Sequence, residues 1–165
     1  MSIADDDTMF ERAPVSLWLE DFSAIRALFE QWRSQGITDL RAHLRADPAR
    51  VAECTRRLVV LKVNRRTLEL YGAADRNELL AGLARIFRDD RFEQHVEELA
   101  ALWDGRSRWT SRSVNYTLAG RRMDIALDAC LLPGHEADWT RVLIAIDDVT
   151  ERVRAEQRLV HSERY

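Results

Sequence analysis

Four histidines and two cysteines are the side chains in this sequence best suited to acid–base, nucleophilic or metal chemistry. The histidines are scattered without the spacing of zinc ligands, at His43, His95, His135 and His161. The cysteines are too few for a disulfide framework and fit no metal-binding pattern; they are Cys54 and Cys130. The sequence also lacks a glycine-rich phosphate loop and a His-Glu-x-x-His motif. We therefore expect no enzyme activity, and an enzyme fragment with a site assembled from distant residues is an alternative.

Size and charge limit the kinds of partner. A chain of 165 residues, 46% of them hydrophobic, can build one core, so we expect one domain. The net charge of −3, from 25 basic and 28 acidic residues, leaves no surplus of positive charge for binding nucleic acid or an anionic membrane. No apolar run approaches the roughly 20 residues that span a bilayer, and the acidic N-terminus does not resemble a signal peptide. We expect a cytoplasmic protein with reduced thiols.

Helical periodicity dominates the first part of the chain. Ser23 is a suitable N-cap for a helix over residues 24–35, whose large apolar residues recur with helical spacing. Thr38 and the pair Asp47-Pro48 are suitable starts for two further helices before residue 58. The sequence thus predicts three consecutive helices in residues 23–57.

Strand patterns flank these helices and fill the later part of the chain. Residues 15–22 fit a first strand, and the β-branched run at 58–63 fits a second. From residue 107 onward apolar and polar residues alternate, with a hairpin turn at Ala119-Gly120 and a further strand at 142–146. Helices and strands sorted by region are typical of an α+β fold, here with an antiparallel meander.

The segment after the last strand carries a capping signal. Asp148 precedes Glu151 with the spacing of a capping box, and the side chains of Asp148 and Thr150 can accept hydrogen bonds from N–H groups at a helix start. We expect these three residues to transfer a signal, because a shift of the strand would reorient the helix that follows. That helix, over 151–165, is marginal alone and is expected to pair with a second copy or with a neighbouring domain.

Two segments resemble the PAS sensory-domain family. Residues 10–15 (Phe-Glu-Arg-Ala-Pro-Val) are similar to the start of the first PAS strand, and residues 146–152 (Ile-Asp-Asp-Val-Thr-Glu-Arg) are similar to the Asp-x-Thr exit of these domains. The resemblance implies a PAS domain over 1–150, with an antiparallel five-stranded sheet and flanking helices, followed by a signalling linker helix over 151–165. The three helices in 23–57 depart from the family, which joins its first two strands by a tight turn, and we interpret them as an insertion.

The resemblance also implies a sensory or regulatory role upstream of an effector, such as the histidine kinase of a bacterial two-component system or a diguanylate cyclase. We expect a homodimer whose exit helix passes the signal to that effector. PAS domains usually enclose a cavity for a small organic ligand, and the residues expected to line it here are Val60, Tyr116, Ile125, Leu127, Cys130, Val142 and Ile144. Because apolar strand residues also fill ordinary cores, a pure protein-interaction module with a filled core is an alternative.

The resemblance to PAS domains raises two candidate cofactors, haem and flavin. Haem-binding PAS domains usually supply the axial ligand from the long helix before the meander, where this chain has His95. The neighbours of His95 in sequence are polar and indicate a solvated face, so haem is an alternative and not our prediction. Photoactive flavin-binding relatives carry an Asn-Cys-Arg-Phe-Leu motif, and neither cysteine of this chain has that context. We predict no metal site, and the sequence does not identify a cofactor.

Overall fold

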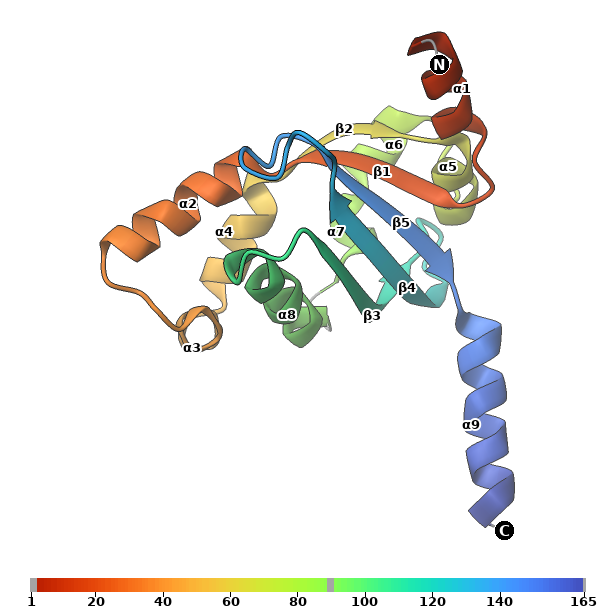
Figure 1. Cartoon of the computed structure of the whole chain (residues 1–165). Helices are drawn as coiled ribbons and strands as arrows, with labels where there is room; N and C mark the ends of the chain where they lie inside the picture. The colour runs from red at the N-terminus through yellow and green to blue at the C-terminus, as the bar shows by residue number, and fades with distance from the viewer. Residues whose placement is uncertain (1–2, 89–90, 165) are drawn as a thin grey trace.

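The computed structural model describes residues 3–88 and 91–164. The centre of the described part is an antiparallel sheet with strand order β2-β1-β5-β4-β3 (Figure 1). β3, β4 and β5 are neighbours, as predicted for the meander, and β1 lies between β5 and β2. The strands are β1 (Ser16–Asp21), β2 (Val59–Val63), β3 (Arg108–Tyr116), β4 (Arg122–Leu131) and β5 (Val142–Asp148). The α+β class and the five-stranded antiparallel sheet are therefore confirmed.

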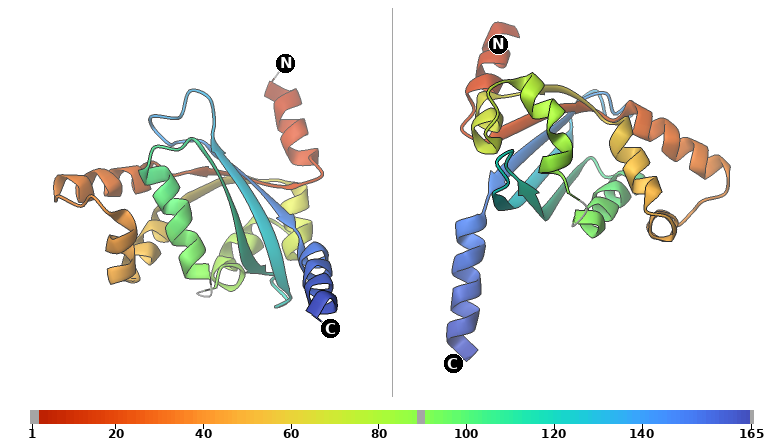
Figure 2. Two further views of the ribbon diagram at one scale, coloured as in Figure 1. Left: turned by 60° about the horizontal axis from the view of Figure 1, so that its bottom comes forward. Right: turned by 180° about the vertical axis from the view of Figure 1, so that it is seen from behind.

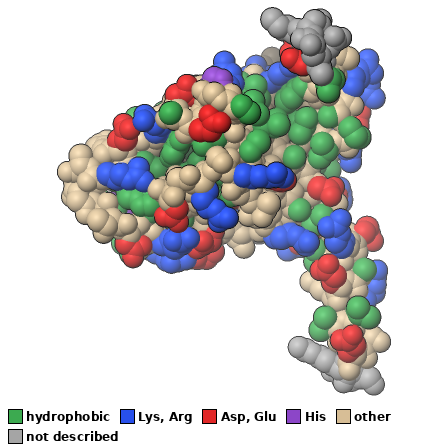
Figure 3. Space-filling model, in the orientation of Figure 1, with side chains coloured by type: hydrophobic (Ala, Val, Ile, Leu, Met, Phe, Trp, Pro, Cys, Tyr) green, Lys and Arg blue, Asp and Glu red, His purple; other side chains and the backbone are tan. Residues whose placement is uncertain are grey.

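The two faces of the sheet differ in burial because side chains alternate along each strand. On β4 every second residue from Met123 to Leu131 is buried, and the residues between them are partly buried. β1 and β5 alternate in the same way, with Trp18 and Ile144 on the buried side, which we call the core face. The opposite face is turned toward the viewer in Figures 1 and 3, and hydrophobic side chains gather on it as well.

Helices cover the core face of the sheet (Figures 1 and 2). They are α5 (Arg65–Tyr71), α6 (Arg76–Ala81), α7 (Leu83–Ile86) and α8 (Phe92–Trp103). The start of α5 is fixed by Asn64, whose Oδ1 accepts hydrogen bonds from the N–H of Thr67 at 3.1 Å and from the N–H of Leu17 on β1 at 3.0 Å. One buried amide therefore caps this helix and attaches it to the sheet.

The predicted helical insertion between the first two strands is confirmed. Its helices are α2 (Ser23–Ser34), α3 (Leu40–Ala46) and α4 (Ala49–Arg57). Two of the predicted caps are wrong: Ser23 is the first residue of α2 and donates its N–H to Asp21 Oδ1 at 2.8 Å, and Asp39 replaces Thr38 as the cap of α3. In both places a neighbouring aspartate accepts the N–H at the helix start, so the hydroxyl side chain is not needed there.

The two ends of the described chain are helical. α1 (Ile3–Arg12) is attached to β2 by an ion pair between Lys62 Nζ and Asp7 Oδ1 at 2.9 Å. α9 (Thr150–Arg164) follows β5 directly and projects away from the sheet (Figures 1 and 2). Within residues 3–88 and 91–164, no helix has the length and apolar character required to cross a membrane.

Candidate functional site

A cleft of about 1070 Å³ lies between the insertion and the helices on the core face. One wall is built from α4 and β2, and the other from α6, α7 and the first residues of α8. Most of the lining is apolar, with a small number of polar groups, which are Thr55, Arg56, Arg88, Arg91 and His95. Large apolar clefts with few polar groups are typical of small-molecule sites.

A smaller cavity of about 60 Å³ adjoins the inner end of the cleft. The two share Thr55, Leu58 and His95 in their linings. The smaller cavity is also lined by Leu127 of β4 and Ile144 of β5. The core face of the sheet therefore takes part in the candidate site through β5, which leads to α9, and through the neighbouring strand β4.

The structure brings together some of the predicted cavity residues and separates others. Val60 lines the cleft, and Leu127 and Ile144 line the smaller cavity. Ile125 and Val142 are fully buried on the core face but line neither space.

Tyr116 and Cys130 correct the prediction. Tyr116 pairs with Arg122, and Cys130 is one residue out of step with the buried row of β4, so both lie on the face opposite to the core. The apolar character of a residue does not reveal its face; the register of the strand does, because a shift of one residue exchanges the two faces.

A buried polar cluster lies beside the cleft, centred on Arg91, whose side chain is only 6% exposed. Arg91 Nη1 donates to Asn115 Oδ1 at 3.3 Å, and Arg91 Nη2 lies 3.6 Å from Glu98 Oε2. Asn115 Nδ2 donates to Tyr71 Oη at 2.7 Å, and Ser111 Oγ donates to Glu98 Oε1 at 3.0 Å. Arg91 Nε is buried without a hydrogen-bond partner among the described residues. An unpaired buried donor is costly and marks the place where an acceptor would be stabilising.

Glu20 adds a second carboxyl group to this cluster. It lies on the core face of β1 and is 5% exposed. Burial, assisted by the charge of Glu98 and opposed by Arg91, raises the pKa of Glu20 to about 8. Burial also raises the pKa of Glu98, against the effects of Arg91 and Ser111. At neutral pH Glu20 is therefore protonated, within the electrostatic influence of the permanent cation Arg91.

His95 occupies a different environment from the one its neighbours in sequence suggest. It lines both the cleft and the smaller cavity, which corrects the expectation of a solvated face. Burial, assisted by the charge of Arg91, lowers the pKa of His95 to about 3, so its imidazole is neutral at physiological pH. A neutral imidazole is the form that binds metal, and haem at His95 accordingly stays an alternative.

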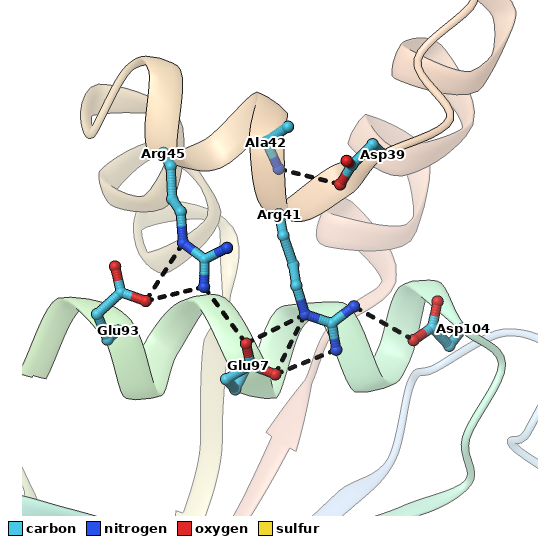
Figure 4. Close-up of polar contacts among 7 residues, drawn as sticks. All are labelled: Asp39, Arg41, Ala42, Arg45, Glu93, Glu97 and Asp104. Atoms are coloured by element: carbon cyan, nitrogen blue, oxygen red, sulfur yellow. Dashed lines mark hydrogen bonds and ion pairs between the residues drawn. The ribbon is translucent and has the colours of Figure 1, made fainter.

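Ion pairs fasten the insertion to α8 beside the cleft (Figure 4). Arg41 of α3 holds Glu97 through Nε and Nη2, each 3.1 Å from a carboxylate oxygen, and its Nη1 lies 3.9 Å from Asp104 Oδ2. Arg45 Nη2 lies 2.9 Å from Glu93 Oε2. All of these side chains are exposed, so each pair is individually weak and sensitive to salt.

We expect the double substitution Arg41→Gln and Arg45→Gln to loosen the insertion without unfolding the domain, because the apolar core beneath α2 and α4 is unchanged. At low salt the melting temperature should fall by at most about 2 °C, and in concentrated NaCl the difference should vanish. Buried Cys54 on α4 reports the opening: in a Cys130→Ser background its reaction with a thiol reagent should accelerate. Arg26→Gln, which removes an ion pair within α2, is the control. An unchanged rate at Cys54 would contradict a fastening role.

The junction between β5 and α9 brings two of the predicted signal-transfer residues together. Asp148 Oδ1 accepts hydrogen bonds from the N–H of Thr150, at 3.0 Å, and from its hydroxyl group. Thr150 Oγ1 also accepts the N–H of Asp124 on β4 at 3.1 Å, and the N–H of Val149 donates to the carbonyl of Asp124 at 2.8 Å. The start of α9 is therefore bonded to two strands. Against the effect of burial, hydrogen bonds from Thr150 and the charge of Arg121 hold the pKa of Asp148 below its usual value.

Glu151, the third predicted signal-transfer residue, is not brought into this junction. Its side chain is 84% exposed, and its Oε1 lies 3.5 Å from Arg154 Nη1 within α9. The capping-box spacing is present, but the side chain that accepts an N–H at the helix start is that of Asp148, which binds the N–H of Thr150.

Sequence reasoning missed Arg91 and Glu20 as site residues. Arg91 shares one helical face with His95, Glu98 and Leu102, at intervals of three and four residues, and this spacing is a usable signal. Glu20 shares its strand face with Ser16 and Trp18, so the period of two placed a carboxyl group in a buried row.

This chain is similar in structure to several solved proteins. No protein-family model and no curated protein sequence matches this chain. The PAS domain of a protein from Colwellia psychrerythraea matches with a TM-score of 0.58 at 11% identity, over 90% of this chain and 98% of that one. The PAS domain of a LuxR-family transcriptional regulator from Burkholderia thailandensis, in complex with ethanol, matches with a TM-score of 0.53 at 12% identity, over 87% and 96%. The LOV domain of a blue-light activated histidine kinase from Erythrobacter litoralis EL346 matches with a TM-score of 0.54 at 16% identity, over 84% and 99%.

Proposed function

We propose that this chain, which has the PAS fold, is a sensory domain that binds a small organic ligand in its cleft and signals through α9. The observation that carries the proposal is the junction at Asp148 and Thr150, where the exit helix shares hydrogen bonds with β4 and β5. Because Asp124 and Thr150 are bonded to each other, a shift of β4 changes the position from which α9 starts. The role is regulatory, with no catalysis by the domain itself.

The cleft supports this proposal because it adjoins the strands that end at the junction. Leu127 lies three residues from Asp124 on β4, and Ile144 lies four residues from Asp148 on β5. A ligand that fills the cleft as far as the smaller cavity would press on Leu127 and Ile144. It would shift the equilibrium only as far as it binds one arrangement of these strands better than the other.

A thermal-shift screen with small organic acids, alcohols and amines tests the proposal. A ligand present at about 100 times its Kd stabilises the folded state by about 2.7 kcal/mol, which raises the melting temperature measurably. The same ligand should change amide hydrogen exchange at Asp124 and Val149. If no compound stabilises the protein, the filled-core interaction module is favoured instead.

We further propose that the domain works as a homodimer attached to an effector domain, such as a histidine kinase or a diguanylate cyclase. Leu159 and Val160 of α9 are 62% and 51% exposed. Every side chain from Arg154 to Glu163 is exposed, and a helix of 15 residues with so little packing is marginal in water. The domains from Burkholderia thailandensis and Erythrobacter litoralis that share this fold belong to proteins named as a transcriptional regulator and a histidine kinase, which supports an attached effector.

Deletion of residues 151–165 should weaken self-association, because it removes the exposed apolar positions of α9. Sedimentation velocity at several protein concentrations measures this change. α2 offers no alternative interface through Phe29 and Trp32, because both side chains are buried in the core. A dimer that is unchanged by the deletion would contradict pairing through α9 and would direct attention to the open face of the sheet (Figure 3).

A further inference from the structure

We infer that the ligand of the cleft is an amphipathic organic anion, with an apolar body and a carboxylate or similar acidic head that reaches Arg91. This inference rests on the proposed function, because it names the ligand class of the same site. Two independent features of the structure carry it: the charge of the lining and the unpaired donor on Arg91.

The charged groups that line the cleft are all cationic among the described residues. Arg56, Arg88 and Arg91 contribute guanidinium groups, and His95 contributes a neutral imidazole. Arg56 is paired with Glu53 at the exposed surface of α4, and Arg88 lies over the ring of Tyr116, 3.8 Å from its centroid. A cavity lined by cations and low-dielectric walls attracts anions and disfavours cationic ligands.

Arg91 provides a preformed polar end for this cleft. Its side chain is 6% exposed, and burying a guanidinium group that deeply is costly unless its donors are satisfied. Asn115 occupies one terminal nitrogen, and the contact with Glu98 is loose at 3.6 Å. The Nε donor has no partner among residues 3–88 and 91–164. Guanidinium groups bind carboxylates through paired N–H donors, so an acidic head group would supply the missing acceptor.

Glu20 favours an anion over a cation at the same place. A protonated Glu20 contributes no negative charge at neutral pH and can donate its proton in a hydrogen bond. Among the described residues of the cluster, Glu98 is then the remaining carboxyl group that can oppose the charge of Arg91. An ammonium ligand would have to approach Arg91 without a compensating pair of carboxylates.

The rest of the cleft lining favours a ligand whose body is apolar. Val51, Val60, Leu83, Phe87 and Phe92 provide aliphatic and aromatic walls along the cleft. Small hydrophilic anions such as phosphate or sulfate would leave these walls in contact with water and gain only the polar end. A medium-chain or aromatic carboxylate satisfies both parts of the site.

The test is calorimetric titration of the full 165-residue chain at pH 7 with three probes of equal chain length: decanoate, decan-1-ol and decyltrimethylammonium. We expect decanoate to bind at least about tenfold more tightly than the other two, a difference of about 1.4 kcal/mol. Arg91→Gln should remove most of that preference. Because this variant leaves Glu98 without its cation and can fail to fold, two further variants place an acid on exposed lining positions: Ala52→Glu and Ala84→Glu.

Each of the two glutamate variants should weaken decanoate binding by about threefold to tenfold and leave decanol binding unchanged. Ala81→Glu, an exposed position on α6 outside the lining, is the matched control and should change neither. Equal binding of decanol and decanoate would overturn the anion inference while leaving a ligand-binding sensor intact. Decanoate binding that is absent, or insensitive to the lining variants, would also overturn it. Tight and cleft-dependent decanoate binding without any change in hydrogen exchange at Asp124 would support the ligand class and contradict the proposed signalling.

Discussion

Replacing Glu20 with glutamine is expected to stabilise the protein at pH 8 by an amount on the order of 4 kcal/mol, and to have little effect near pH 4.5. The native pKa of Glu20 is raised to about 8 by burial, whereas in the unfolded chain the carboxyl group titrates near the ordinary glutamate pKa of 4.5. Between these values the unfolded state has lost the proton and the folded state retains it. Stability therefore falls as pH rises from about 4.5 to 8, because unfolding releases a proton. Glutamine resembles the protonated acid in shape and does not carry this penalty.

Urea unfolding of both proteins at pH 4.5, 6.5 and 8 measures the effect, and the difference between the two proteins isolates Glu20. Other groups near the cluster titrate as well. Burial raises the pKa of Glu98, so its ionisation also lowers stability as pH rises. Burial lowers the pKa of His95, so this residue makes stability rise with pH below pH 6.5. Their contributions are common to both proteins to a first approximation. Glu11→Gln, at an exposed position on α1, is the control and should run parallel to the unmodified chain. Parallel profiles for Glu20→Gln as well would show that Glu20 is ionised in the folded protein.

The order and type of the elements could be predicted because each follows from a period that is visible in the chain. The three helices of the insertion repeat apolar residues at helical spacing, and β3, β4 and β5 alternate with a period of two. The insertion follows from the same patterns, because three helical segments lie between the first two predicted strands. The capping residues are harder to predict than the helices, because adjacent residues such as Thr38 and Asp39 can both accept the N–H at a helix start.

The cleft could not be predicted in the same way, because it depends on how separate elements pack. Val60, Leu127 and Ile144 were found as apolar residues of strands, but the same reasoning included Cys130, which lies on the other face. The sequence neighbours of His95 predict a solvated face, whereas the structure places it in the lining of the cleft. On a helix the relevant neighbours of a residue lie three and four positions away, and these neighbours face the sheet.

The double substitution Asp148→Ala and Thr150→Ala is expected to loosen the attachment of α9 to the sheet while the domain stays folded. It removes the two side-chain acceptors that hold the N–H of Thr150 and the N–H of Asp124, and leaves the backbone hydrogen bond from Val149 to the carbonyl of Asp124. Loss of a helix cap costs about 1 kcal/mol, and each unsatisfied amide costs a similar amount. Amide exchange at Asp124 and in the first turn of α9 should accelerate about tenfold or more, because local opening follows these bonds. In a fusion to an effector the response to ligand should be lost.

The β4–β5 loop supplies a matched control for this experiment. Asp138 Oδ1 accepts hydrogen bonds from the N–H and the hydroxyl group of Thr140, both at 2.8 Å, which reproduces the turn at Asp148 and Thr150 without a helix after it. Trp139, between them, is buried and has a positive φ of 59°, so Asp138→Ala with Thr140→Ala should lower global stability at least as much. If the coupling is specific, that variant leaves exchange at Asp124 relative to the rest of β4 unchanged. Collapse of the whole domain in the Asp148 and Thr150 variant alone would mean that the junction is part of the core structure, and transfer of a signal through it would lose its physical basis.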